Sequence, residues 1–195
     1  MAAGCAGLRK QRNLISTLLK AIAGVQASPK ILTIDGPAGS GKTTLAQTLR
    51  EEVERSSTSV EISHMDDLYH GWGDALTETL TENLGKIIRQ TSLPTIEHPV
   101  FDWNSNSYGS SRIISTPEVL ILEGVGSGQR AIRGEISLSI WIDVEEERGL
   151  ERVIARDGEQ VQPFMKRWQT EQAKHFLLEG SMGAADYCLD GAPSA

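Results

Sequence analysis

The stretch from Lys30 to Thr44 limits what this chain can fold into more than any other part of its sequence. It begins with a mostly apolar segment, which is followed by GPAGSGKT from Gly36 to Thr43. These eight residues complete the pattern G-x-x-x-x-G-K-[ST]. Apolar residues before this pattern predict a buried strand, and the residues after it predict a helix. The sequence therefore predicts a phosphate-binding loop (P-loop) between a strand and a helix.

The residue types of this loop suit the binding of a nucleoside triphosphate. Glycines let backbone N–H groups turn toward a polyphosphate, and the helix that begins at Gly41 adds the positive end of its dipole. We expect Lys42 to contact the β- and γ-phosphates and Thr43 to place its hydroxyl on Mg²⁺. The residues expected to hold the nucleotide are Gly36, Pro37, Ala38, Gly39, Ser40, Gly41, Lys42, Thr43 and Thr44.

Composition limits the class of protein further. The 195 residues fit one domain, and 39% hydrophobic with 23% charged residues is typical of a soluble globular chain. No apolar run approaches the roughly 18 residues of a membrane span. A net charge of −7 disfavours binding to polymeric nucleic acid, which needs a basic surface. Cys5 and Cys188 form no C-x-x-C pair, so we expect a cytoplasmic protein without a disulfide framework or a zinc site.

Residues 1–29 differ from the rest of the chain in charge. The first 30 residues carry five basic side chains and no acidic one. An apolar stripe at helical spacing ends at Gly24 and consists of Leu8, Ile15, Leu18, Leu19 and Ile22. Such a segment fits an amphipathic helix docked on the body or a transit peptide. We favour the docked helix, and we place the boundary of the P-loop domain after residue 29, with the domain spanning 30–195.

The rest of the chain alternates between apolar strands and helices. Strands are predicted at 60–65, 119–124, 138–143 and 186–190, with helices at 44–55 and 75–90, after 145–147 and at 163–179. The segment 91–116 is rich in proline, asparagine and serine, and we interpret it as a long functional connection. This alternation predicts an α/β fold with a parallel five-stranded sheet.

Candidate functional residues stand at the carboxyl ends of three of the predicted strands. Ligands of an open parallel sheet bind beyond the carboxyl ends of its strands, where Gly36, Asp66 and Glu123 each stand. A phosphate-binding loop, a hydroxyl with carboxylates for Mg²⁺, and a carboxylate that accepts a proton are the parts that phosphoryl transfer requires. The sequence therefore favours a phosphotransferase site at this edge.

Arginines recur every four residues at Arg148, Arg152 and Arg156, so they share one face of a predicted helix. They either stabilise the charge of a transferring phosphoryl group or form a solvated face paired with neighbouring glutamates.

Several motifs together resemble the uridine kinase and phosphoribulokinase group of P-loop kinases, over about Lys30 to Asp190. They are the loop from Gly36 to Thr43, Asp66-Asp67-Leu68-Tyr69, Phe101-Asp102-Trp103, Ile121-Leu122-Glu123-Gly124 and the run from Arg152 to Asp157. The resemblance implies the P-loop NTPase fold of nucleoside kinases, with three layers, a parallel five-stranded sheet and a helical lid.

The same resemblance implies roles for individual residues. Asp66 matches the group's catalytic aspartate, which acts with Lys42, and Glu123 matches an acid near magnesium, so the implied Mg²⁺ ligands are Thr43, Asp66 and Glu123. Arg152 and Arg156 match the lid arginines. The residues implied for the acceptor are Asp66, Tyr69, Phe101, Asp102 and Trp103.

The acceptor element departs from the group's pattern. Phe101 stands where uridine kinases usually carry tyrosine, and the usual histidine and arginine are missing from the residues that follow. We therefore expect an ATP- and Mg²⁺-dependent kinase that phosphorylates a hydroxyl of a small molecule, with a nucleoside such as uridine as the leading candidate. The alternatives are a different small hydroxyl acceptor or a regulatory nucleotide-dependent NTPase. A homo-oligomer is compatible with either.

Overall fold

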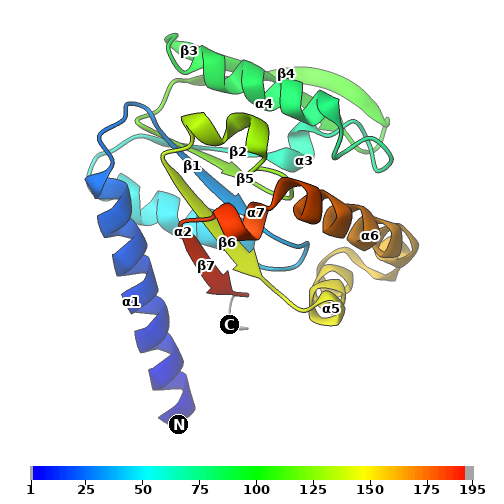
Figure 1. Cartoon of the computed structure of the whole chain (residues 1–195), viewed down its shortest axis with the longest axis horizontal. Coiled ribbons are helices and arrows are strands. Elements are labelled where there is room, and N and C mark those ends of the chain that lie inside the picture. Colours follow the sequence, from blue (N-terminus) through cyan, green and yellow to red (C-terminus); the bar gives the residue numbers. More distant parts are fainter. Residues whose placement is uncertain (1, 192–195) are drawn as a thin grey trace.

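A five-stranded parallel sheet forms the centre of the molecule in the computed structural model, which describes residues 2–191 and their side chains from Asn13 onward (Figure 1). The sheet order is β2-β5-β1-β6-β7, and all four neighbouring pairs are parallel. The strands are β1 (Lys30–Asp35), β2 (Val60–His64), β5 (Val119–Glu123), β6 (Leu138–Asp143) and β7 (Tyr187–Asp190). This confirms the predicted α/β fold with a parallel five-stranded sheet.

Helices cover both faces of this sheet, which gives three layers (Figure 1). Side chains alternate between the faces along each strand, so that Ile31 belongs to one apolar core and Leu32 to the other. Every residue of β5 is buried, as expected for a central strand covered on two sides. One core packs against α1 (Ala2–Gly24) and α2 (Lys42–Glu54), and the other against α4 (Glu78–Gln90) and α6 (Gln162–Glu179).

The remaining helical elements are short or lie at the edge of the sheet. They are α3 (Met65–Leu68), η1 (Arg130–Glu135), α5 (Glu146–Asp157), η2 (Glu159–Val161) and α7 (Ser181–Ala184). Glycine ends α5 and α6, because Gly158 and Gly180 adopt positive φ angles of 91° and 63° that side-chain-bearing residues avoid. Proline stands in the first turn of α6, where its missing N–H costs no hydrogen bond.

The C-terminal half of α1 packs against the sheet, whereas its N-terminal end extends away from the body (Figure 1). Leu18 and Ile22 are buried in the core that α2 also covers. The Lys30 side chain donates a 2.9 Å hydrogen bond to the Ile22 carbonyl, which joins the helix end to the first strand. The side chains of Cys5 and Leu8 lie outside the described part.

The segment 91–116 contains regular structure that the sequence interpretation did not include. It forms an antiparallel hairpin of β3 (Thr95–Asp102) and β4 (Ser107–Ser115) beside α3 and α4. The proline and serine residues that indicated a loop stand instead at a register shift after Pro99 and along an exposed strand. The hairpin turn carries Trp103.

The residues after β2 also differ from expectation. The strand predicted at 60–65 ends at His64, and Asp66 and Asp67 lie in the helical turn α3 that follows it directly. The next helix begins at Glu78 rather than at residue 75, because residues 69–77 form an irregular loop. A helical turn separates the two aspartate side chains by about 100° around its axis, so they still point in different directions.

Candidate active site

A cavity of about 720 Å³ opens at the carboxyl ends of the strands. Three segments that are far apart in the sequence meet in it: the phosphate-binding loop, α3 and the end of β5. Helices α5 and α6 supply a further wall. The polar side chains in the lining are Lys42, Thr43, Thr44, Asp66, Glu123, Arg152, Arg156 and Asp157.

The phosphate-binding loop packs closely against the backbone of β6 and α5. Gly36 and Gly39 have positive φ angles of 138° and 77°, and a Cβ on them would overlap the backbone of Ile142 and Gly149, respectively. Ala38, Gly39 and Gly41 line the cavity together with the first residues of α2, whereas Gly36, Pro37 and Ser40 do not. The glycines are therefore required by close backbone packing on β6 and α5 as well as by the turn itself.

Lys42 is buried at the start of α2. Its Nζ donates hydrogen bonds to the carbonyl oxygens of Gly36 (2.8 Å) and Pro37 (2.7 Å). Burial lowers the pKa of Lys42, while the nearby carboxylates of Asp35, Glu123 and Asp66 raise it. The Lys42 ammonium group is therefore in a position to bind anionic oxygens in addition to these two carbonyls.

Asp35, the last residue of β1, holds the start of the phosphate-binding loop through hydrogen bonds. It was not identified as a site residue from the sequence. Its Oδ1 accepts hydrogen bonds from the N–H groups of Gly36 (2.7 Å) and Gly126 (2.9 Å), and its Oδ2 accepts one from Gly128 (3.0 Å). Burial raises the pKa of Asp35, and these three hydrogen bonds and Lys42 oppose that rise. The available signal was an acidic residue at the end of an otherwise apolar strand.

Thr43, Glu123 and His64 form a hydrogen-bonded group at one side of the cavity. Glu123 Oε1 accepts a 3.0 Å hydrogen bond from the Thr43 hydroxyl and lies 2.5 Å from His64 Nδ1. The hydrogen bond with Glu123 raises the pKa of His64. No signal in the sequence indicated the contact between His64 and Glu123, because the pairing of β2 with β5 creates it.

This oxygen set suits Mg²⁺ rather than a transition metal. Thr43 offers a hydroxyl, and Glu123 and Asp66 offer carboxylates that line the same cavity. Within residues 13–191, no three histidine, cysteine or acidic side chains gather in a way that could hold a metal ion. Mg²⁺ is commonly bound by one or two carboxylates together with the phosphates of a substrate, so the residues present fit this ion.

Asp66 lines the cavity, whereas Asp67 does not. The surrounding protein raises the pKa of Asp66 by desolvation, and the Glu123 carboxylate adds to the rise. Lys42 and Arg156 act in the opposite direction. The surroundings of Asp66 therefore make its carboxylate a stronger proton acceptor than an ordinary aspartate.

Two of the three arginines of α5 reach the cavity. Arg152 Nη1 donates a 3.2 Å hydrogen bond to the Gly39 carbonyl of the phosphate-binding loop. Arg156 pairs with Asp157 through two 2.7 Å hydrogen bonds, which raise its pKa further above the ordinary value. Arg148 is exposed and does not line the cavity. The structure thus divides this stripe into two cavity residues and one surface residue.

Aromatic side chains form one wall of the cavity, to which α6 contributes Trp168. Trp72 stacks on Phe164 with ring centroids 5.8 Å apart and meets the edges of Trp103 and Trp168 at 5.3 and 5.8 Å. Tyr69 lies 5.5 Å from Trp168. All except Phe164 line the cavity, along with the aliphatic side chains of Val125, Val153, Val161 and Met165. Neither Trp72 nor Trp168 was identified as a site residue from the sequence, because each reaches the cavity only through the packing of distant segments.

Phe101 and Asp102 lie outside the cavity lining, unlike Trp103 and Tyr69. Phe101 is buried and supports Trp103 from behind, with ring centroids 5.1 Å apart. Asp102 accepts hydrogen bonds from the Asn104 N–H and the Ser105 hydroxyl, both at 2.9 Å, which lower its pKa. In this structure both residues shape the hairpin turn that presents Trp103.

The fold and the loop resemble those of P-loop NTPase domains, and comparison with known proteins agrees with this resemblance. The family model of the KAP family P-loop domain matches residues 11–93. No curated protein matches the sequence significantly. Among the residues described, no helix combines the length and the apolar character that crossing a bilayer requires.

Several solved kinase structures share the fold. A possible uridine kinase from Bacillus stearothermophilus has a TM-score of 0.70 at 22% identity, over 93% of this chain and 100% of that one. A putative fructose transport system kinase from Silicibacter gives 0.63 at 17% identity, over 90% and 97% of the two chains. D-glycerate 3-kinase from Cryptococcus neoformans gives 0.54 at 14% identity, over 81% and 85%. The resemblance to the uridine kinase group is thereby confirmed at the level of the fold.

Proposed function

We propose that this protein is an ATP- and Mg²⁺-dependent kinase that transfers the γ-phosphate to a hydroxyl of a small molecule. The observation that carries this proposal is a single cavity that holds Lys42 and Thr43 next to Glu123 and also contains Asp66 and an aromatic wall. Nucleotide binding alone requires only the loop. An acceptor molecule needs a carboxylate that binds its hydroxyl, here Asp66, and an apolar wall that packs against the rest of the molecule.

The residues of the loop divide the binding of the nucleotide between them. The backbone N–H groups and Lys42 bind the phosphates, with Lys42 leaving its carbonyl partners in the loop for phosphate oxygens. Thr43, Glu123 and Asp66 hold Mg²⁺, which supplies positive charge against the phosphate oxygens when bound. Arg152 and Arg156 add positive charge from α5, in the manner of a helical lid.

Asp66 orients the acceptor hydroxyl and accepts its proton as the new O–P bond forms. Its raised pKa fits this role, because a carboxylate of higher pKa accepts a proton more readily. Asp67 lies outside the cavity lining and has no such role.

The aromatic wall favours an acceptor with a flat, weakly polar part. Tyr69, Trp72, Trp103 and Trp168 offer ring faces and edges, and stacking on such side chains stabilises planar groups. A nucleoside carries a planar base together with a ribose hydroxyl, so a uridine-like acceptor remains the leading candidate. A different small alcohol with an aromatic or apolar part is the next candidate.

A regulatory NTPase is the second candidate, and the matched family model favours it because its name describes an NTPase P-loop domain. In this case water or a protein partner replaces the acceptor. The cavity wall argues for a small molecule, since a flat ring suits these aromatic side chains better than water does. We propose a cytoplasmic location for either activity, which suits the exposed free thiol of Cys188.

The test is a screen of nucleosides and small sugars for ATP turnover in the presence of Mg²⁺. We expect one class of hydroxyl compound to increase turnover and to appear as a phosphorylated product. Lys42→Ala should abolish that product while leaving the protein folded. ATP hydrolysis that no hydroxyl compound stimulates, but that a protein partner does, would instead indicate the regulatory NTPase.

A further inference from the structure

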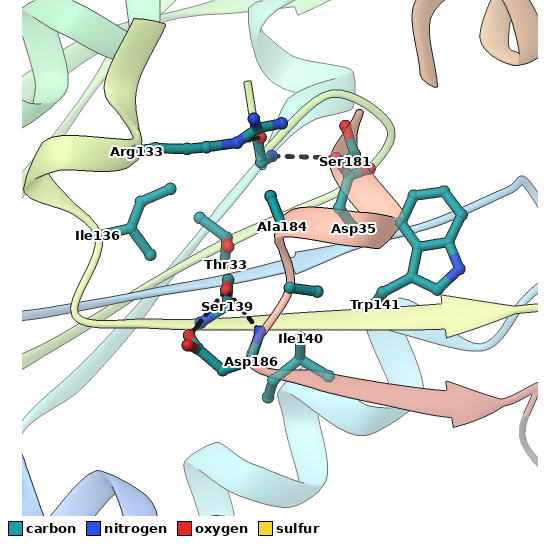
Figure 2. A pocket seen from close by; sticks show the side chains of 12 residues that line it. Thr33, Asp35, Arg133, Ile136, Ser139, Ile140, Trp141, Ser181, Ala184 and Asp186 are labelled. Carbon is teal, nitrogen blue, oxygen red and sulfur yellow. Dashed lines mark hydrogen bonds between the residues drawn. The ribbon is translucent and has the colours of Figure 1, made fainter. Parts of the chain in front are cut away.

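A second cavity, of about 160 Å³, is lined by residues of β1, β6 and α7 and shares no residue with the first (Figure 2). Its deep end is formed by Thr33 and Asp35 of β1 with Ser181 of α7, all buried. Its outer part includes Ala184 and Asp186, which are exposed. The cavity therefore connects a polar interior with the surface.

Two hydroxyls at the deep end are buried without a partner. Thr33 is 1% exposed and Ser181 is 5% exposed, yet neither Thr33 Oγ1 nor Ser181 Oγ has a hydrogen-bond partner among the described residues. A buried polar group without a partner is costly, and most such groups in native proteins are satisfied. Two of them around one cavity indicate a polar occupant.

Charged side chains of both signs line the cavity, namely Asp35, Arg133 and Asp186. Asp35 accepts hydrogen bonds from backbone N–H groups only, and Arg133 donates to the carbonyls of Gly128 (3.1 Å) and Glu179 (2.6 Å). No ion pair within residues 13–191 includes either side chain. Figure 2 shows the Arg133 guanidinium directed toward Asp35 and Ser181. A ligand with a cationic and an anionic end would complement both.

Size and wall chemistry limit the ligand further. A cavity of about 150 Å³ holds a molecule of about six non-hydrogen atoms. Ile136, Ile140 and the ring of Trp141 give the remaining wall an apolar surface. We propose that this cavity binds a small zwitterionic amino acid of the size of glycine or alanine. Its ammonium group binds Asp35 and the two hydroxyls, and its carboxylate binds Arg133.

Asp35 connects this cavity to the phosphate-binding loop. The same carboxylate that faces the cavity accepts a hydrogen bond from the Gly36 N–H at the start of the loop. A bound ammonium group next to the Asp35 carboxylate offsets its negative charge and competes for the oxygen that accepts the hydrogen bond from Gly36. Occupancy of the cavity therefore changes the affinity for nucleotide, a step that rests on the proposed function.

The first experiment titrates L-alanine into the full chain by calorimetry, with acetate and ethylamine as probes that each carry one charged end. We expect saturable alanine binding that is at least tenfold tighter than that of either probe, because only alanine meets both charges. Absence of saturable alanine binding, or equal binding of acetate, would overturn the proposal.

Matched variants separate the cavity from the rest of the protein. Thr33→Val keeps the side-chain shape and removes an unpartnered hydroxyl, so we expect the thermal stability to be no lower than that of wild type and alanine binding to be about three- to tenfold weaker. Ser63→Ala is the control, because Ser63 also has a buried, unpartnered hydroxyl but does not line this cavity. Equal alanine affinity in Thr33→Val and wild type would overturn the assignment.

The second experiment measures ATP binding with and without saturating alanine. We expect at least a twofold change in ATP affinity, with alanine affinity changing by the same factor when ATP is present. Unchanged ATP affinity would overturn the connection through Asp35. A chain that binds alanine and no ATP would instead count against the proposed kinase function, so the two failures are distinguishable.

Discussion

The Thr43 hydroxyl donates a 3.0 Å hydrogen bond to Glu123 Oε1, across 80 positions of the chain. Parallel pairing of β1 with β5 places Ile34 beside Glu123, so the end of β5 lies next to the phosphate-binding loop. The bond holds a hydroxyl and a carboxylate, both proposed ligands of Mg²⁺, in one place before any ligand binds. Preorganised oxygens of this kind reduce the cost of ordering a metal site.

Glu123→Gln should weaken Mg²⁺ binding, because the amide keeps the shape of the side chain but removes its negative charge. We expect the Mg²⁺ concentration for half-maximal activity to rise about 10- to 100-fold. The measurement is a Mg²⁺ titration of turnover at saturating ATP. Glu82→Gln, on the exposed face of α4, is the control and should leave the titration unchanged. A wild-type Mg²⁺ requirement in Glu123→Gln would remove Glu123 from the proposed metal site.

Asp66→Asn should lower the single-turnover rate of acceptor phosphorylation by about 10² to 10⁴, the usual contribution of general acid–base catalysis. ATP affinity should change less, because the loop binds most of the nucleotide. Asp67→Asn is the matched control, since its side chain does not line the cavity. If Asp67→Asn were the inactive variant, the proton acceptor would be misassigned by one residue. If both variants stayed active, no proton acceptor would lie in α3.

The same assignment predicts a pH dependence. The pKa of Asp66 is raised by desolvation and by Glu123, and its active form is the carboxylate. The rate should therefore be full above this raised pKa and decrease as the pH falls through it. The acidic limb of the profile of wild-type kcat should lie above the ordinary value of 3.8 for aspartate and should be absent from the residual activity of Asp66→Asn.

Arg156→Ala should reduce kcat by about 10³-fold or more, as expected for an arginine that stabilises a transferring phosphoryl group. Arg148→Ala is the control on the same helix, because Arg148 is exposed and lies outside the cavity. Steady-state kinetics with the identified acceptor give both values. A change of less than about threefold in Arg156→Ala, with the fold intact, would favour the solvated-face interpretation.

Leu18→Ala tests the docking of α1. Leu18 is fully buried in the core shared with α2, so we expect a loss of about 2–5 kcal/mol in the free energy of unfolding. Ser16→Ala, at an exposed position of the same helix, should change it by less than about 0.5 kcal/mol. Denaturant unfolding provides the comparison. Equal stability of both variants would mean that α1 does not dock in solution, as a transit peptide would not.

Local sequence was sufficient for the elements that depend on neighbouring residues. The phosphate-binding loop follows from residues that stand next to one another, and the apolar runs that became β1, β5 and β6 follow from burial of central strands on both faces. The arginine stripe was also visible, because helical spacing alone places its residues on one face. The hairpin of 95–115 could not be predicted from local sequence, because the pairing of β3 with β4 outweighs the loop-like composition of this segment.

The sequence by itself thus determined the class of fold, the phosphate-binding loop and the edge of the sheet at which Asp66 and Glu123 lie. Tertiary structure alone decided that Asp35 supports the loop, that His64 contacts Glu123, and that Trp72 and Trp168 form one wall. The physical reason is separation along the chain: His64 and Glu123 are 59 positions apart, and Asp35 and Gly128 are 93 apart. Contacts of this length depend on strand order and helix packing, which no local pattern specifies.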